Sequence, residues 1–145
     1  MAAFTNYAEN KIADALFRAQ SLGAPATWHV GLFTATPSDT GGGTEVSGGS
    51  YARVSVTAGL TAFNGTHGTT TGASSGTGGT VTNAASWTFP SPTANWGSIT
   101  HWGLFDAPSS GNLWVYGALT TGKTVNNGDA APVFSAGSAS VQIDN

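Results

Sequence analysis

The chain reads T-W-H-V-G-L-F-T at residues 27–34 and T-H-W-G-L-F-D at residues 100–106. The frame His-x-Gly-Leu-Phe therefore occurs twice, beginning at His29 and at His101. Residues in both copies alternate with the two-residue period of a β-strand, which puts a Leu on one face and a Phe on the other. The Gly between them lets a bulky neighbour approach the strand closely. We interpret the repeat as two related positions in a β-sheet.

The same repeat supports a second hypothesis, in which the two strands bring His29 and His101 together over a metal or a substrate. A metal would need a third protein ligand, and the nearby candidates are Asp39 and Asp106. Strand parity puts Asp106 on the face opposite His101, which weakens this set. We therefore expect an architectural role, and two imidazoles within about 4–5 Å of each other would contradict it.

The composition excludes several classes of partner. Four Lys and Arg stand against seven Asp and Glu, giving a net charge of −3. Nucleic acid and anionic membrane surfaces both need clustered basic residues, so neither is expected. The chain has no cysteine, which excludes disulfides and thiolate metal sites. Only 8% of its 145 residues are charged, a composition that favours association with protein partners.

Targeting and membrane signals are also missing from the sequence. No run of 18 apolar residues is present, so we expect no membrane span. The stretch M-A-A-F-T-N-Y lacks the basic and apolar regions of a secretory signal, so we do not expect simple export.

One stretch, residues 6–22, has helical character. Asn6 is placed to cap the helix, a Glu three residues later completes a capping-box pattern, and Gly23 is placed to end it. Ile12 and Leu16 lie at helical spacing in a narrow apolar stripe. The stripe needs a surface to lie on, which can be its own domain, a neighbouring subunit or a larger assembly.

After residue 25 the pattern changes to that of strands. Separated by turn residues, the predicted strands are 28–33, 51–57, 60–63, 80–82, 85–89, 99–106, 113–119, and 133–135 with 138–143. They predict a mainly β fold, an antiparallel β-sandwich that is jelly-roll-like, with one N-terminal α-helix. We expect residues 1–24 to form a helix or arm and residues 25–145 a single sandwich domain. The Gly/Thr/Ser-rich loops 38–50 and 64–80 are expected to be exposed.

Two further patterns point to chemistry only weakly. G-A-S-S-G at 72–76 matches a nucleophile elbow, but no strand precedes it and no helix follows. The five Trp residues could form a platform for stacking sugars, with Trp96 expected to be the exposed ring. A core or a subunit interface is the commoner use of such rings. We expect neither enzymatic activity nor a cofactor.

The chain resembles a family of small structural proteins of tailed bacteriophages, which includes capsid cement or decoration proteins and proteins called tail fibre proteins. The resemblance rests on five segments that cover most of the chain: N-Y-A-E-N-K-I-A-D-A-L-F, A-P-A-T-W-H-V-G-L-F-T-A-T-P-S-D, G-G-G-T-E-V-S-G-G-S-Y-A-R-V, A-N-W-G-S-I-T-H-W-G-L-F-D-A and G-N-L-W-V-Y-G-A-L-T-T-G-K-T-V-N-N-G-D. The run T-E-V-S-G-G-S-Y-A-R-V is the most specific of these.

The resemblance implies a virion structural protein made in the host bacterial cytoplasm. The first expectation is a cement or decoration protein that forms a homotrimer and binds the major capsid protein or other virion proteins. The alternative is a tail or tail-fibre component that contacts the host surface and binds glycans. The candidate assembly contacts are Ile12, Leu16, Tyr51, Arg53 and Trp96. Arg53 either anchors a carboxylate or a carbonyl, or is a solvent-facing strand charge.

Overall fold

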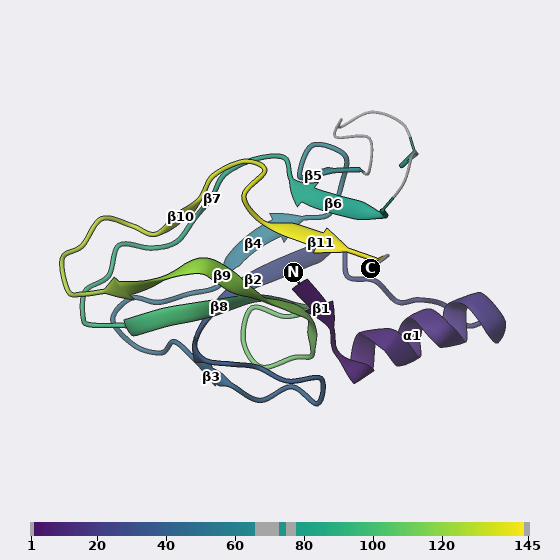
Figure 1. Cartoon of the computed structure of the whole chain (residues 1–145), viewed down its shortest axis with the longest axis horizontal. Coiled ribbons are helices and arrows are strands. Elements are labelled where there is room, and N and C mark those ends of the chain that lie inside the picture. Colours follow the sequence, from purple (N-terminus) through teal and green to yellow (C-terminus); the bar gives the residue numbers. More distant parts are fainter. Residues whose placement is uncertain (1, 66–72, 75–77, 144–145) are drawn as a thin grey trace.

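The computed structural model describes residues 2–65, 73–74 and 78–143, which form a mainly β structure with one helix (Figure 1). In chain order the elements are β1 (Ala2–Phe4), α1 (Asn6–Phe17), β2 (Thr27–Ala35), β3 (Thr44–Glu45), β4 (Val54–Thr57), β5 (Phe63–Asn64), β6 (Thr80–Asn83), β7 (Trp87–Thr88), β8 (Gly97–Phe105), β9 (Leu113–Val125), β10 (Val133–Phe134) and β11 (Ser140–Gln142). Within this part of the chain, no helix is long and apolar enough to cross a membrane.

The strands form one large sheet and two small ones. The large sheet has the order β1-β9-β8-β2-β3, and β4 also pairs with β2. The small sheets have the orders β10-β7 and β11-β6-β5, and the strand pairs of all three sheets are antiparallel. The predicted fold class is confirmed: the protein is mainly β, with antiparallel sheets as in a β-sandwich and one N-terminal helix.

The repeated motif forms the centre of the large sheet. In the pairing of β2 with β8, Gly31 lies opposite Gly103, and the motif is therefore related to itself by a local two-fold axis. His29 lies opposite Phe105, while His101 lies opposite Phe33, four residues further along β2. At the usual rise of about 3.4 Å per residue, the two histidines are about 14 Å apart along the sheet. The architectural interpretation of the repeat is confirmed.

One face of this strand pair builds the main core. Leu32 and Trp102 lie opposite each other on that face and are 2% and 4% exposed. The ring of Trp102 contacts the ring of Trp87 in β7, with centroids 6.2 Å apart. The small sheets therefore pack against this face as a second layer, and their aromatic side chains complete the core.

The other face carries a second, smaller cluster around the paired glycines. Phe33 and Phe105 stack with their centroids 5.8 Å apart and their planes at 22°. A Cβ atom on Gly103 would lie 2.6 Å from Cδ1 of Leu113 and 3.1 Å from Cε2 of Phe33. A Cβ atom on Gly31 would lie 2.9 Å from Cε2 of Phe105. Each Phe ring therefore occupies the space that the glycine of the opposite strand leaves open.

The helix is shorter than the sequence predicted. It begins after Thr5, whose hydroxyl accepts from the backbone N–H of Ala8 and donates to the carbonyl of Leu113. Thr5 is therefore the N-cap, and the prediction that Asn6 caps the helix is wrong. The helix ends at Phe17 with Arg18 as its C-cap, and Ala19 adopts a left-handed φ of 54°. The prediction that Gly23 ends the helix is therefore wrong, because the chain has already left the helical conformation at Ala19.

Two other predictions about the chain path need correction. Loop 38–50 is not simply exposed, because it contains β3 and the buried Val46, whose N–H donates to the carbonyl of Leu32. Loop 64–80 and the G-A-S-S-G segment lie largely outside the described residues. Each predicted strand segment overlaps an observed strand, whereas β1 and β3 were not predicted. Because β1 pairs with β9, residues 2–4 belong to the large sheet and not to a separate arm.

The glycine pair gives a direct test of the central packing. We predict that Gly103→Ala lowers the free energy of unfolding by about 1–3 kcal/mol, because the added methyl group meets both a side chain and the carbonyl oxygen of Val115 at 3.0 Å. Gly59→Ala is the matched control, since nothing lies within 4 Å of its added Cβ. Urea unfolding of both variants measures the difference, and equal stabilities would contradict the packing described here.

Candidate functional site

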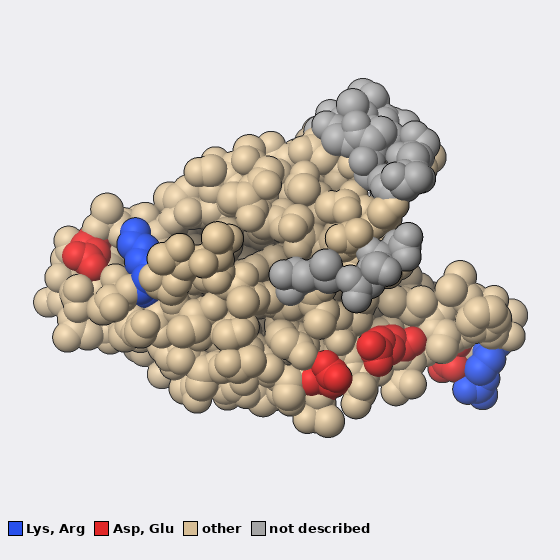
Figure 2. Space-filling model, in the orientation of Figure 1, with Lys and Arg blue, Asp and Glu red and all other residues tan. Residues whose placement is uncertain are grey.

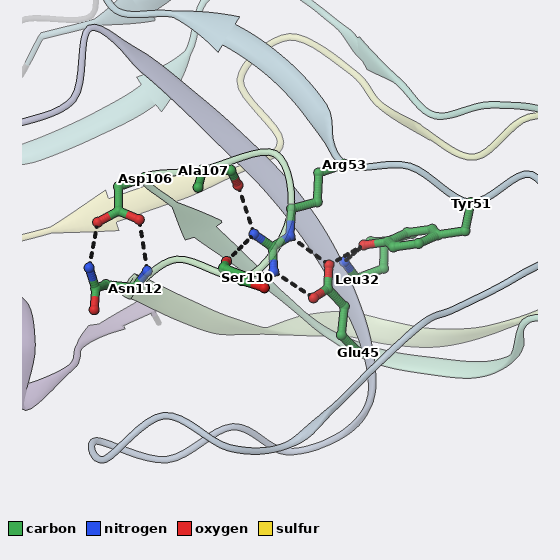
Figure 3. Close-up of polar contacts among 8 residues, drawn as sticks. All are labelled: Leu32, Glu45, Tyr51, Arg53, Asp106, Ala107, Ser110 and Asn112. Carbon is green, nitrogen blue, oxygen red and sulfur yellow. Dashed lines mark hydrogen bonds and ion pairs between the residues drawn. The ribbon is translucent and has the colours of Figure 1, made fainter.

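The smaller cluster, formed by Phe33, Phe105 and Leu113 and called the outer cluster below, is covered by an ion pair between two segments of the chain. The side chain of Arg53 is 6% exposed, and its Nε and Nη2 donate to the two carboxylate oxygens of Glu45 at 2.7 Å each. This two-point geometry holds β3 against the segment that leads into β4 (Figure 3). Arg53 therefore anchors a carboxylate, as one of the two sequence hypotheses proposed.

The same guanidinium also binds the β8–β9 turn. Its Nη1 donates to the carbonyl oxygens of Ala107 and Ser110, at 2.7 and 2.8 Å. Its central carbon lies 3.3 Å from the centroid of the Phe105 ring, a cation–π contact. One side chain thus joins β3, the approach to β4 and the β8–β9 turn (Figure 3).

Tyr51 connects this ion pair with the main core. Its hydroxyl accepts from the N–H of Leu32 and donates to Glu45, at 2.8 and 2.9 Å. Its ring packs edge-on against Trp96, with centroids 5.3 Å apart. Burial raises the pKa of the Tyr51 phenol far above its usual value, and the neighbouring Glu45 carboxylate raises it further. The hydroxyl therefore stays protonated and keeps donating at any physiological pH.

Asp106 organises the β8–β9 turn itself. It accepts from the backbone N–H and the side-chain amide of Asn112, at 2.7 and 2.8 Å, and from the indole of Trp114 at 3.3 Å. Partial burial raises the pKa of Asp106, but these hydrogen bonds outweigh it and leave the pKa below its usual value. The carboxylate is therefore a fixed acceptor that holds the turn in the position from which Arg53 binds it.

The predicted assembly contacts separate into two groups. Tyr51, Arg53 and Trp96 lie in or against the interior, where they hold the chain's own segments together. Trp96 is 5% exposed and its indole donates to the carbonyl of Gly49, so the prediction that it is an exposed ring is wrong. Ile12, which is half-buried, and Leu16, which is exposed, instead line a groove that is open to solvent.

Ile12 and Leu16 line an open apolar groove of about 540 Å³ at one end of the sandwich. The helix and the segment after it form one wall, strands of both layers form the floor and the opposite wall, and all lining residues are apolar: Phe4, Ile12, Leu16, Leu22, Ala24, Trp28, Phe63, Val81, Leu104, Trp114, Val115, Val141 and Ile143. On the face in Figure 2, charged side chains lie at the two ends and along the lower edge, and the body is uncharged.

The helix does not close this groove. Ala8 is its only buried residue, and Tyr7 packs edge-on against Trp114 near the helix start. Further along, Leu16 and Phe17 are 70% and 84% exposed. The second half of α1 therefore projects beyond the sheets, as Figure 1 shows.

The described residues contain no cluster of three or more His, Asp or Glu side chains that could hold a metal ion. Nδ1 of His29 lies 3.1 Å from the hydroxyl oxygen of Ser55 on β4, and Nδ1 of His101 lies 2.9 Å from that of Thr100. Each histidine therefore has a polar partner of its own. Both rings belong to the sheet, not to a shared site.

Comparison with known families then identifies the class of protein. The chain matches, over residues 3–142, the family described as podophage GP4 fiber I protein gp80. The chain belongs to this family. No curated protein matches the chain. As a member of the Gp80 family, the chain is a structural protein of the phage virion, which confirms the predicted class.

The structural network in this Gp80-family chain includes residues that the sequence did not single out. Glu45 lay in a segment predicted to be an exposed loop, and Asp106 was considered only as a metal ligand. A signal for Glu45 was available: it is one of seven acids and stands in the same specific run as Arg53, one of four basic residues. In a chain with so few charges, an acidic and a basic residue this close in the sequence are expected to form an ion pair.

The buried ion pair can be compared directly with an exposed one. We predict that Arg53→Ala lowers the free energy of unfolding by about 3 kcal/mol, because it leaves the Glu45 carboxylate partly buried without its partner. Arg18→Ala removes an ion pair to Asp14 in which both side chains are exposed, and should cost less than about 0.5 kcal/mol. Chemical unfolding of both variants checks this, and similar losses would contradict the structural role of Arg53.

Asp106 gives a pH-dependent prediction. Because its pKa is lowered in the folded state, its carboxylate stabilises the fold above the unfolded-state value of about 3.9, and this stabilisation is lost as the pH falls through the lower, folded-state pKa. We predict that Asp106→Asn costs about 1 kcal/mol at neutral pH. The difference from wild type should shrink as the pH falls below about 3.9. A difference that stays constant down to strongly acidic pH would contradict this.

Proposed function

We propose that the chain is a non-enzymatic subunit of a fibre on the virion of a podophage-like bacteriophage. The observation that carries this proposal is the match to a fibre-protein family over nearly the whole chain. The molecule's own features support it: a rigid sandwich, few charges and an apolar end that a fold working alone would be expected to cover.

In this role the chain works by burying surface between copies and against other virion proteins. We propose a homotrimer, made in the host cytoplasm, that joins the fibre to the particle through protein contacts. The capsid-cement role is the second candidate, and the open apolar end would serve it equally well. Glycan binding through Trp96 has no support, because that ring is inside the fold.

The two candidates predict different locations on the particle. We expect gold-labelled antibodies against the purified chain to decorate the fibres of intact virions in electron micrographs. Antibodies adsorbed beforehand with the purified chain serve as the control. Even labelling of the capsid shell, with bare fibres, would overturn the fibre proposal in favour of the cement role.

A further inference from the structure

The second half of α1 lacks a partner for its apolar side chains. The helix has 12 residues, a length that is marginal in water without tertiary packing. Its packing on the sheet is concentrated at its start, around Ala8 and Tyr7. Leu16 and Phe17 then present a large aliphatic and a large aromatic side chain to solvent. Such a projecting helix end is stabilised when another surface covers it.

The groove beside the helix is also apolar and open to solvent. Its lining is apolar throughout, and Ile143 on its rim is 70% exposed. The part of the sequence outside the described residues consists of Thr, Gly, Ser, His, Asp and Asn, with Met1 as its one large apolar residue. These residues therefore bring little apolar surface that could fill the groove.

The distribution of charge also favours the end of α1 as the occupant of the groove. The groove lining carries no charged residue, so a charged ligand would be desolvated without a partner. Close to Phe17, Arg18 and Asp14 form an ion pair at 2.9 Å. The tip can therefore enter an uncharged groove without bringing an unpaired charge.

Both sides of such a contact offer exposed apolar side chains. A large aromatic side chain buries about 150–250 Å² when fully covered, so Phe17, which is 84% exposed, would contribute more than about 100 Å² from the helix end. On the groove side, Leu16, Leu22 and Ile143 are each at least 38% exposed.

We propose that the groove of each chain receives the end of α1 from a second copy of the same chain, with Phe17, which is not part of its own groove lining, as the inserted side chain. Each copy then contributes a projecting helix end at one contact and a groove at the other. A contact of this head-to-tail kind closes into a ring when the rotation between copies allows it, which fits the proposed trimer. The inference deepens the proposed fibre role and rests on it for its biological meaning.

The first test measures self-association of the purified full chain by sedimentation. We expect the wild type to be oligomeric at micromolar concentration. Phe17→Glu and Ile143→Glu, at opposite sides of the contact, should each weaken association at least about 30-fold, as at an interface hot spot. Leu60→Glu is the matched control: Leu60 is 57% exposed and lies outside the groove, and its replacement should leave association unchanged.

The second test uses the absence of cysteine in the sequence. Phe17→Cys and Ile143→Cys are placed on separate, differently tagged copies, which are mixed and oxidised. We expect a disulfide between the two copies, and much less cross-linking when Leu60→Cys replaces Ile143→Cys. Near-ultraviolet circular dichroism confirms that each variant is folded.

Two results would overturn the interface: a wild type that is monomeric at micromolar concentration, or an oligomer that resists both Glu variants and cross-links no better through Ile143→Cys than through Leu60→Cys. Either result leaves the fibre role intact, because that role is tested separately by labelling of virions. Conversely, labelling on the capsid shell would remove the fibre role without affecting the self-association measured here.

Discussion

The stacking of Phe33 on Phe105 across the Gly31–Gly103 pair is the contact on which the rest of the structure depends. It fixes the register of β2 on β8, because a shift by one residue would put the two rings on the opposite face and a side chain where only glycine fits. The register in turn sends Leu32 and Trp102 into the main core. One contact therefore sets both faces of the large sheet.

The outer face of that sheet is closed by the chain itself. Arg53 lies over the ring of Phe105 and is held there by Glu45 and by two carbonyls of the β8–β9 turn. The chain has few charged residues, so few other groups compete for the Arg53 guanidinium, which stays bound to one carboxylate and two carbonyls. The apolar groove at the end of the sandwich, by contrast, stays open.

The sequence predicted the strands well because their cause is local. Two-residue alternation and turn residues are visible in any window, and the predicted strand segments all overlap observed strands. The helix limits were wrong because their cause is distant: Thr5 caps the helix only where its hydroxyl reaches the carbonyl of Leu113, far along the chain.

The same distinction between local and distant causes applies to the candidate site. The apolar stripe containing Ile12 and Leu16 was visible as a helical repeat, and both side chains line the open groove. The interior positions of Trp96 and Tyr51 could not be predicted, because they follow from how the loop 38–50 folds back onto the sheet. A scan for scarce charges would have suggested the Glu45–Arg53 pair, but not the ring beneath it.

The central claim is that the chain closes its own sheet face and leaves its apolar end for a partner. Hydrogen–deuterium exchange on the assembled chain and on the Phe17→Glu variant tests this claim most directly. Amides in exposed or weakly packed segments gain protection when they are covered, whereas amides already covered change little. The account predicts that assembly adds protection to residues 12–24 and 140–143, with none added to residues 44–53 or 105–113. Added protection in the latter segments, with the helix and the groove unchanged, would contradict it.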